Sequence, residues 1–190
     1  MRRLVCLLAL SLASCVTYSL VAPGRVEIGE AYTVQPGVAW NRIATGQRER
    51  WTVDGPRLQD LVFFKGLADG ETLFPVNPLA RMTDKAKRTP RFRARMTALE
   101  IQEFVAASLA FAGHAQVRTK DLLPARFGTA DGFRFAFSYA LQDGLEKRGF
   151  AVGRVRNEGL DLILYRGTRL YYYGKYADEA ERIVRSIRLL

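Results

Sequence analysis

Two cysteines and one histidine are the residues of this 190-residue chain whose side chains are best suited to covalent or metal chemistry. Cys15 ends the apolar run LLALSLASC, and Cys6 lies directly before that run. His114 has no second histidine or cysteine near it in the sequence that could complete a zinc site. The chemistry that these positions favour is therefore modification of a thiol close to the N-terminus.

The N-terminal segment has the three parts of a secretory signal peptide. Arg2 and Arg3 give it a positive start, an apolar stretch covers 4–12, and two small residues precede Cys15. An uncleaved membrane anchor is the alternative, because no charged residue occurs from position 4 to position 22. Hydroxyl-bearing residues interrupt the second half of that stretch, which favours the signal peptide.

The tetrapeptide Leu12-Ala13-Ser14-Cys15 resembles the lipobox of bacterial lipoproteins, in which an aliphatic residue and two small residues precede a cysteine. The resemblance implies cleavage between Ser14 and Cys15. It also implies a covalent diacylglycerol group and an N-acyl chain on Cys15, and no other cofactor is expected. Since Cys6 would leave with the signal peptide, the mature chain would keep no thiol for a disulfide, a nucleophile or a metal site.

The residue after the lipobox bears on localisation. Val16 occupies the position at which an aspartate, in enteric bacteria, tends to retain lipoproteins in the inner membrane. The resemblance therefore implies a protein that is lipid-anchored to the cell membrane, in the outer membrane and facing the periplasm. Each buried methylene contributes about 0.8 kcal/mol, so several acyl chains would hold the protein firmly.

We find no catalytic signature in the sequence. The chain has no G-x-S-x-G motif, Ser138 falls within an expected strand, and the glycine patterns that bind phosphate are missing. His114 is expected just beyond the end of a helix. Paired carboxylates could cleave glycosides, but most of the candidates are expected in turns: Asp54, Asp69, Glu71, Asp131 and Asp161. The sequence therefore predicts that the chain is not an enzyme and holds no metal.

A dense group of cations lies between residues 81 and 95, where Asp84 is the one opposing charge. Arg81 begins this basic segment, and the six residues predicted to contact an anionic partner are Lys85, Lys87, Arg88, Arg91, Arg93 and Arg95. Together with the net charge of +10 on the whole chain, this segment predicts an acidic envelope protein, an anionic lipid or a glycan as partner. A solvated loop without function is the alternative. Nucleic acid is not expected, because an exported lipoprotein rarely meets it.

Aromatic residues give a second unusual feature. Tyr171, Tyr172 and Tyr173 are consecutive, and on a strand the first and third would share one face. Core packing on both faces is the simpler interpretation, and an exposed surface for a partner is the alternative. Trp40 and Trp51 are expected in the core or on a sheet face.

Alternating apolar residues predict an antiparallel sheet. Strands are expected within 32–40, 48–55, 58–67, 132–141, 150–157, 160–167 and 168–174. Thr97 and Glu100 form a capping box that predicts a helix over 98–112, and a second apolar stripe predicts a helix over 178–187. The expected fold class is therefore α+β, with an antiparallel strand meander covered by two main helices.

The length of the chain fits one domain of ordinary size. The expected organisation is a signal peptide over 1–14, a lipidated tether over 15–30 and a single α+β domain over 31–190. The tether is expected because its second half contains Pro23 and Gly24 and shows no period.

The run GFRFAFSYAL…GLDLILYRGTRLYYYG…AERIVRSIRLL resembles the PsbP/Mog1-like fold, in which a C-terminal helix after a strand meander ends near a serine, here Ser186. The resemblance covers about 97–190 and implies an accessory or assembly protein more than an enzyme, although fold does not fix function. The leading hypothesis is a non-catalytic binding or assembly module of the cell envelope. An envelope hydrolase acting on glycan or lipid is the alternative, and a purely structural tethered domain is a third.

Overall fold

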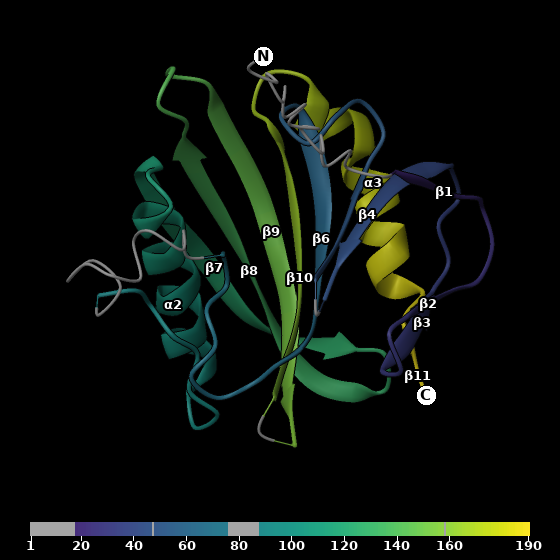
Figure 1. The fold of residues 1–190 in the computed structure, drawn as a ribbon, viewed down its shortest axis with the longest axis horizontal. Helices are drawn as coiled ribbons and strands as arrows, with labels where there is room; N and C mark the ends of the chain where they lie inside the picture. The colour runs from purple at the N-terminus through teal and green to yellow at the C-terminus, as the bar shows by residue number, and fades with distance from the viewer. Residues whose placement is uncertain (1–17, 47, 76–87, 158) are drawn as a thin grey trace, which may run out of the picture.

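The computed structural model describes residues 18–46, 48–75, 88–157 and 159–190. An eight-stranded antiparallel sheet forms the centre of the fold (Figure 1). In spatial order its strands are β1 (Ser19–Val21), β4 (Trp40–Thr45), β5 (Arg48–Thr52), β6 (Gln59–Leu67), β10 (Gly159–Thr168), β9 (Glu146–Arg156), β8 (Ala130–Ala140) and β7 (Ala115–Phe127). A small sheet pairs β11 (Arg188–Leu189), β3 (Tyr32–Val34) and β2 (Val26–Ile28). The predicted α+β class is confirmed.

Two helices lie on opposite sides of the large sheet, α2 (Ala98–Phe111) and α3 (Tyr172–Arg185) (Figure 1). Each face of the sheet has its own apolar core, and neighbouring strand residues alternate between them. Phe63 belongs to the core under α3, whereas Phe64 belongs to the core under α2. The sheet is therefore buried on both faces along its central strands.

Two sequence features behave as expected. Phe133, Phe135, Phe137 and Tyr139 of β8 all enter the core under α2, which confirms the predicted face. The capping box of α2 is also present: the side chain of Thr97 accepts from the amide of Glu100, and Glu100 Oε2 accepts from the amide of Thr97 at 2.7 Å. Trp40 and Trp51 are fully buried, as predicted.

Strand β7 was not expected from the sequence. Its pairing with β8 shifts register twice, between Ala115 and Arg118 and again between Lys120 and Leu123. Gln116 and Asp121 have φ angles of 51° and 57° within these irregular stretches. Each bulge inserts a residue and reverses the faces, so no period of two runs through the strand.

The expected strand over 168–174 is wrong. β10 ends at Thr168, and α3 begins at Tyr172, six residues before the predicted start of that helix. The first turn of α3 packs directly on β10, because a Cβ on Gly167 would meet Tyr173 Cα at 2.5 Å. Tyr165 Oη also donates to the carbonyl of Tyr173 at 2.7 Å.

The expected tether over 15–30 is also corrected, because residues 19–30 belong to the folded domain. β1 pairs with β4, β2 pairs with β3, and Ile28 is fully buried. Strands of three residues are too short to show a period in the sequence. The signal peptide and the lipidation site at Ser14 and Cys15 lie outside the described residues. Within the described part of the chain, no helix is long and apolar enough to span a bilayer.

Candidate functional site

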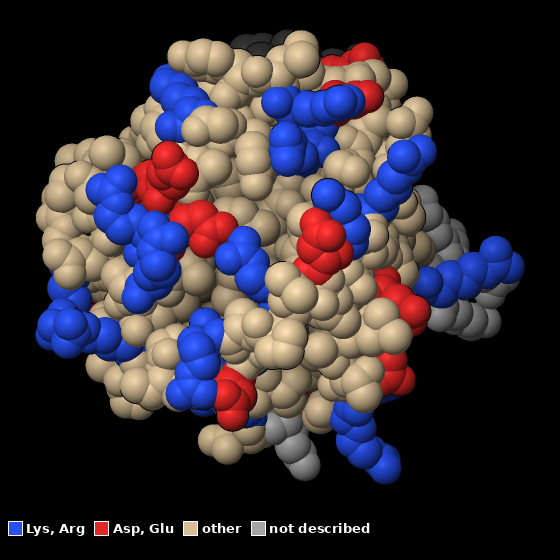
Figure 2. All heavy atoms as spheres, turned by 180° about the vertical axis from the view of Figure 1, so that it is seen from behind, with Lys and Arg blue, Asp and Glu red and all other residues tan. Residues whose placement is uncertain are grey.

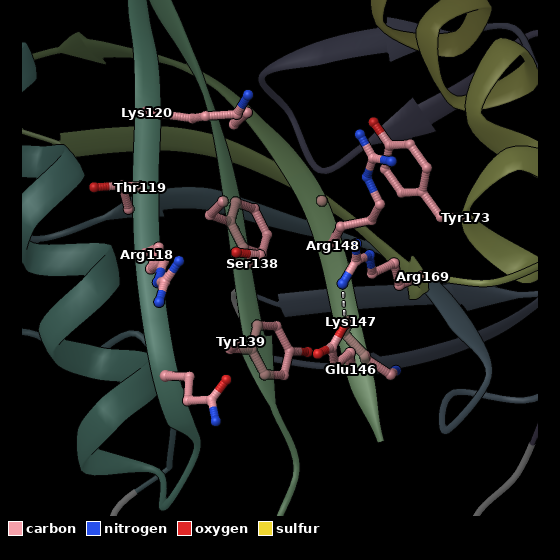
Figure 3. A pocket seen from close by; sticks show the side chains of 14 residues that line it. Arg118, Thr119, Lys120, Ser138, Tyr139, Glu146, Lys147, Arg148, Arg169 and Tyr173 are labelled. Carbon is pink, nitrogen blue, oxygen red and sulfur yellow. Dashed lines mark hydrogen bonds and ion pairs between the residues drawn. The ribbon is translucent and has the colours of Figure 1, made fainter. Parts of the chain in front are cut away.

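A pocket of about 730 Å³ opens between β7, β8 and β9 and the first turn of α3 (Figure 3). Its charged lining residues are five cations and one carboxylate: Arg118, Lys120, Lys147, Arg148, Arg169 and Glu146. We refer to it as the cationic pocket. The excess of positive charge in a concave site favours an anionic ligand.

Strand register places the central residues of the cationic pocket in one row. Arg118 pairs with Ser138, and Ser138 pairs with Arg148. Directly paired residues of antiparallel strands point to the same face, so the two arginines flank one hydroxyl group. Their backbones lie about 10 Å apart, because each strand adds about 4.8 Å. Long arginine side chains can converge across that distance on one oxyanion.

Arg148 is held in place by an aromatic ring. Its guanidinium lies 4.6 Å from the ring centroid of Tyr173, which projects from α3 towards β9 (Figure 3). Tyr173 itself packs against the buried ring of Tyr165, with 5.4 Å between the centroids. The contact orients the guanidinium without neutralising its charge.

Ion pairing separates the cations of the pocket into two groups. Arg169 Nη1 donates to Glu146 Oε2 at 2.5 Å, and Lys120 lies 3.2 Å from Asp121. In contrast, no residue of the described structure forms an ion pair with Arg118 or Arg148. Elsewhere, many Lys and Arg side chains on the face seen in Figure 2 lie beside an Asp or Glu. The unpaired arginines are therefore the groups best able to bind a ligand.

Lys147 differs from the other lysine of the pocket because it is buried, with 4% of its surface exposed. Its Nζ donates to the carbonyl of Pro56 at 3.3 Å. Burial lowers the pKa of Lys147 to about 8; Asp60 opposes this effect, and Arg166, Arg50 and Arg57 add to it. Lys147 is thus a charge at the edge of the core more than a ligand-binding group.

Lys147→Met is expected to remove a pH-dependent rise in stability. Between pH 8 and pH 10.5, the unfolded chain keeps the Lys147 proton that the folded chain has lost. Unfolding then takes up a proton, so the free energy of unfolding of the wild type rises with pH, by up to roughly 3 kcal/mol. Urea denaturation of both proteins across this interval measures the difference, and parallel curves would contradict the assignment.

His114 lies just past the end of α2, as expected, and its ring stacks on Tyr139 with 4.5 Å between the centroids. Burial lowers the pKa of His114, and the nearby charges of Arg166 and Lys147 lower it further. The neutral imidazole is therefore favoured over the imidazolium.

The five candidate carboxylates are not brought together around His114. Four of them have local partners: Asp54 pairs with Lys175, Asp69 with Arg93, Asp131 with Arg126, and Glu71 accepts from the amide of Ala68. Asp54, Asp69 and Glu71 lie in turns or loops, as predicted for most of the five. Asp131 lies at the start of β8, and Asp161 is fully buried in β10, where it accepts from Arg154 and Arg156. Within the described residues, no cluster of three or more His, Cys, Asp or Glu could hold a metal.

Part of the basic segment is a fixed strap. Phe92 is fully buried, and its amide donates to the carbonyl of Glu71 at 2.9 Å. On either side, Arg91 Nη1 donates to the carbonyl of Gly70 at 2.7 Å, and Arg93 lies 3.3 Å from Asp69. Two of the six predicted contact residues therefore bind the neighbouring turn.

Of the remaining cations of the basic segment, some are exposed and others lie outside the described residues. Arg88 and Arg95 are exposed. Lys85 and Lys87 lie outside the described residues, as does Arg81. A contact with an anionic partner stays a prediction for this segment.

The sequence analysis did not predict the cationic pocket. The one feature of the sequence that pointed to it was the spacing of Arg118 and Lys120 by two residues, which places two cations on one face of a regular strand.

No protein-family model and no curated protein matches this sequence. Among solved structures, the chain is similar to cyanobacterial PsbP (CyanoP) from Synechocystis sp. PCC 6803. The TM-score is 0.51 at 10% identity, over 97% of this chain and 99% of the other. The chain also matches the structure of LpqN, which is involved in cell envelope biogenesis of Mycobacterium tuberculosis. That TM-score is 0.36 at 9% identity, over 94% of this chain and 87% of LpqN. The first likeness extends beyond residues 97–190 and shows that the chain has a PsbP-like fold.

Proposed function

We propose that this chain is a membrane-anchored lipoprotein of the bacterial cell envelope whose folded domain is a non-catalytic module that binds an anionic ligand. The observation that carries the proposal is the row formed by Arg118, Ser138 and Arg148 in the cationic pocket. Two unpaired guanidinium groups around a hydroxyl match the oxygens of a phosphate, sulfate or carboxylate group.

The non-catalytic part of the proposal is supported by the separate engagement of the candidate carboxylates. A hydrolase of glycans would need two carboxyl groups facing one substrate bond. Here Asp54 is bound to Lys175 beside α3, and Asp161 is buried between two arginines on β10. Among the described residues that line the cationic pocket, Glu146 is the one carboxylate, and it is paired with Arg169.

The anchoring part rests on the lipobox at Leu12-Ala13-Ser14-Cys15 and on the short connection behind it. Residues 16–18 separate Cys15 from β1, the first strand in the described part of the chain, so the acyl chains would hold the domain close to the bilayer. Location in the outer membrane, facing the periplasm, is the finer proposal and rests on Val16. Intact mass of the chain purified from membranes tests the anchor: a chain that begins at acylated Cys15 is expected.

Titration calorimetry with inorganic pyrophosphate tests the pocket in the same detergent-solubilised, full mature chain. The double variant Arg118→Ser/Arg148→Ser is expected to bind at least about tenfold more weakly than the wild type, because two charge-assisted contacts are lost. The matched control is Arg88→Ser/Arg95→Ser, which removes the same charge from the basic segment outside the pocket. We expect the control to keep most of the affinity. An equal loss in both variants, or no loss in the pocket variant, would contradict the proposal.

A further inference from the structure

The connection between β10 and α3 exposes two large apolar side chains side by side. Leu170 is 96% exposed and Tyr171 is 61% exposed. Both lie within the segment that lines the cationic pocket, because Arg169 precedes them and Tyr173 follows them (Figure 3). We refer to Leu170 and Tyr171 as the apolar tip. The apolar tip and the cationic pocket are thus continuous parts of one surface.

The backbone is fixed on both sides of the apolar tip. The amide of Thr168 donates to the carbonyl of Leu58 at 2.9 Å, and the amide of Arg169 donates to the carbonyl of Glu146 at 3.0 Å. On the other side, the helix α3 begins directly after Tyr171. A fixed backbone presents Leu170 and Tyr171 to solvent without the entropic cost of ordering a mobile loop.

Ion pairs and one unpaired arginine lie in the segments next to the apolar tip. Arg57 lies in the turn over 56–58 and pairs with Asp143, Arg169 pairs with Glu146, and Lys175 on the first turn of α3 pairs with Asp54. Arg148 adds an unpaired charge beside Tyr173. Exposed Leu and Tyr side chains beside unpaired arginines are complementary to an anionic bilayer, whose interface accepts Leu and Tyr and attracts each free Lys or Arg with about 1 kcal/mol.

We infer that the apolar tip inserts into the interface of an anionic bilayer, and that the cationic pocket binds a phosphate headgroup of that bilayer. The inference rests on the proposed anion-binding function and names its ligand class, an anionic phospholipid in the membrane that carries the anchor. Leu170 and Tyr171 supply apolar contact, while Arg118 and Arg148 supply charge at the depth of the headgroups.

Tryptophan fluorescence tests the inference on the acylated full mature chain in vesicles of equal parts phosphatidylcholine and phosphatidylglycerol that contain brominated lipid. Tyr171→Trp places a reporter on the apolar tip, and the native Trp40 and Trp51 are fully buried and give a constant background. The control is Leu190→Trp, since Leu190 is 69% exposed at the C-terminus, away from the tip (Figure 1). We expect the tip reporter to be quenched several-fold more than the control.

Two second-site variants in the Tyr171→Trp background connect insertion to the residues named. Leu170→Ser is expected to reduce the quenching and to leave pyrophosphate binding unchanged, whereas Arg118→Ser/Arg148→Ser is expected to reduce both. A tip reporter that is no more quenched than Leu190→Trp, in a chain that still binds pyrophosphate, would overturn the inference and leave the proposed function standing. If the Arg118→Ser/Arg148→Ser variant bound pyrophosphate as tightly as the protein with both arginines, the proposed function itself would be overturned, whatever the quenching.

Discussion

Asp60→Asn is expected to lower the free energy of unfolding by about 3 to 5 kcal/mol, because it would leave a buried guanidinium without its counter-ion. Asp60 is fully buried in β6, and Arg166 in the neighbouring β10 is 6% exposed. Arg166 Nε donates to Asp60 Oδ1 at 2.8 Å, and its Nη2 donates to Oδ2. Arg50 approaches the same carboxylate at 3.3 Å from β5. The asparagine would keep the shape of the side chain and remove the charge.

The matched control for Asp60→Asn is Asp143→Asn, which breaks an ion pair at the surface. Asp143 pairs with Arg57, whose side chain is 71% exposed, and the carboxylate is 44% exposed. Water can solvate both groups after the change, so we expect a loss of at most about 1 kcal/mol. Urea denaturation followed by the fluorescence of buried Trp51 measures both variants. Similar losses would show that the buried pair is worth no more than the exposed one.

Elements with an unbroken local pattern could be predicted from the sequence. The helix α2 has a capping box and apolar residues at helical spacing, and β8 alternates four aromatic residues into one core. The elements that were missed lack such a pattern. Two bulges break the period of β7, β1 and β2 have three residues each, and the three tyrosines that suggested a strand open α3.

The candidate site could not be read from the sequence because it depends on pairing between distant strands. Arg118, Ser138 and Arg148 form a row only after the register of β7, β8 and β9 is known. Composition gave the excess of positive charge and gave no indication of which cations are free. Arg166 is neutralised by a carboxylate 106 residues away, and Arg91 binds a carbonyl of the neighbouring turn.

Gly149→Ala is expected to destabilise the domain by about 3 kcal/mol or more, because a methyl group has no room at this position. Gly149 lies in β9, in the row between Phe137 of β8 and Arg166 of β10. An added Cβ would lie 2.6 Å from Phe137 Cζ and closer still to the carbonyl oxygen of Tyr165. That oxygen belongs to a central strand, so it can move only if the pairing of β9 with β10 is distorted. Gly149 also lines the cationic pocket, so weaker binding of pyrophosphate is expected as well.

Gly174→Ala is the matched control for Gly149→Ala, since the same methyl group is added where nothing lies within 4 Å. Gly174 is in the first turn of α3, and alanine is favoured over glycine in a helix by about 0.5 to 1 kcal/mol. We therefore expect Gly174→Ala to be neutral or slightly stabilising in urea denaturation. If both variants unfolded at the same urea concentration, the sheet around Gly149 would have to yield without cost. The short distance between β9 and β10 would then not explain why position 149 is a glycine.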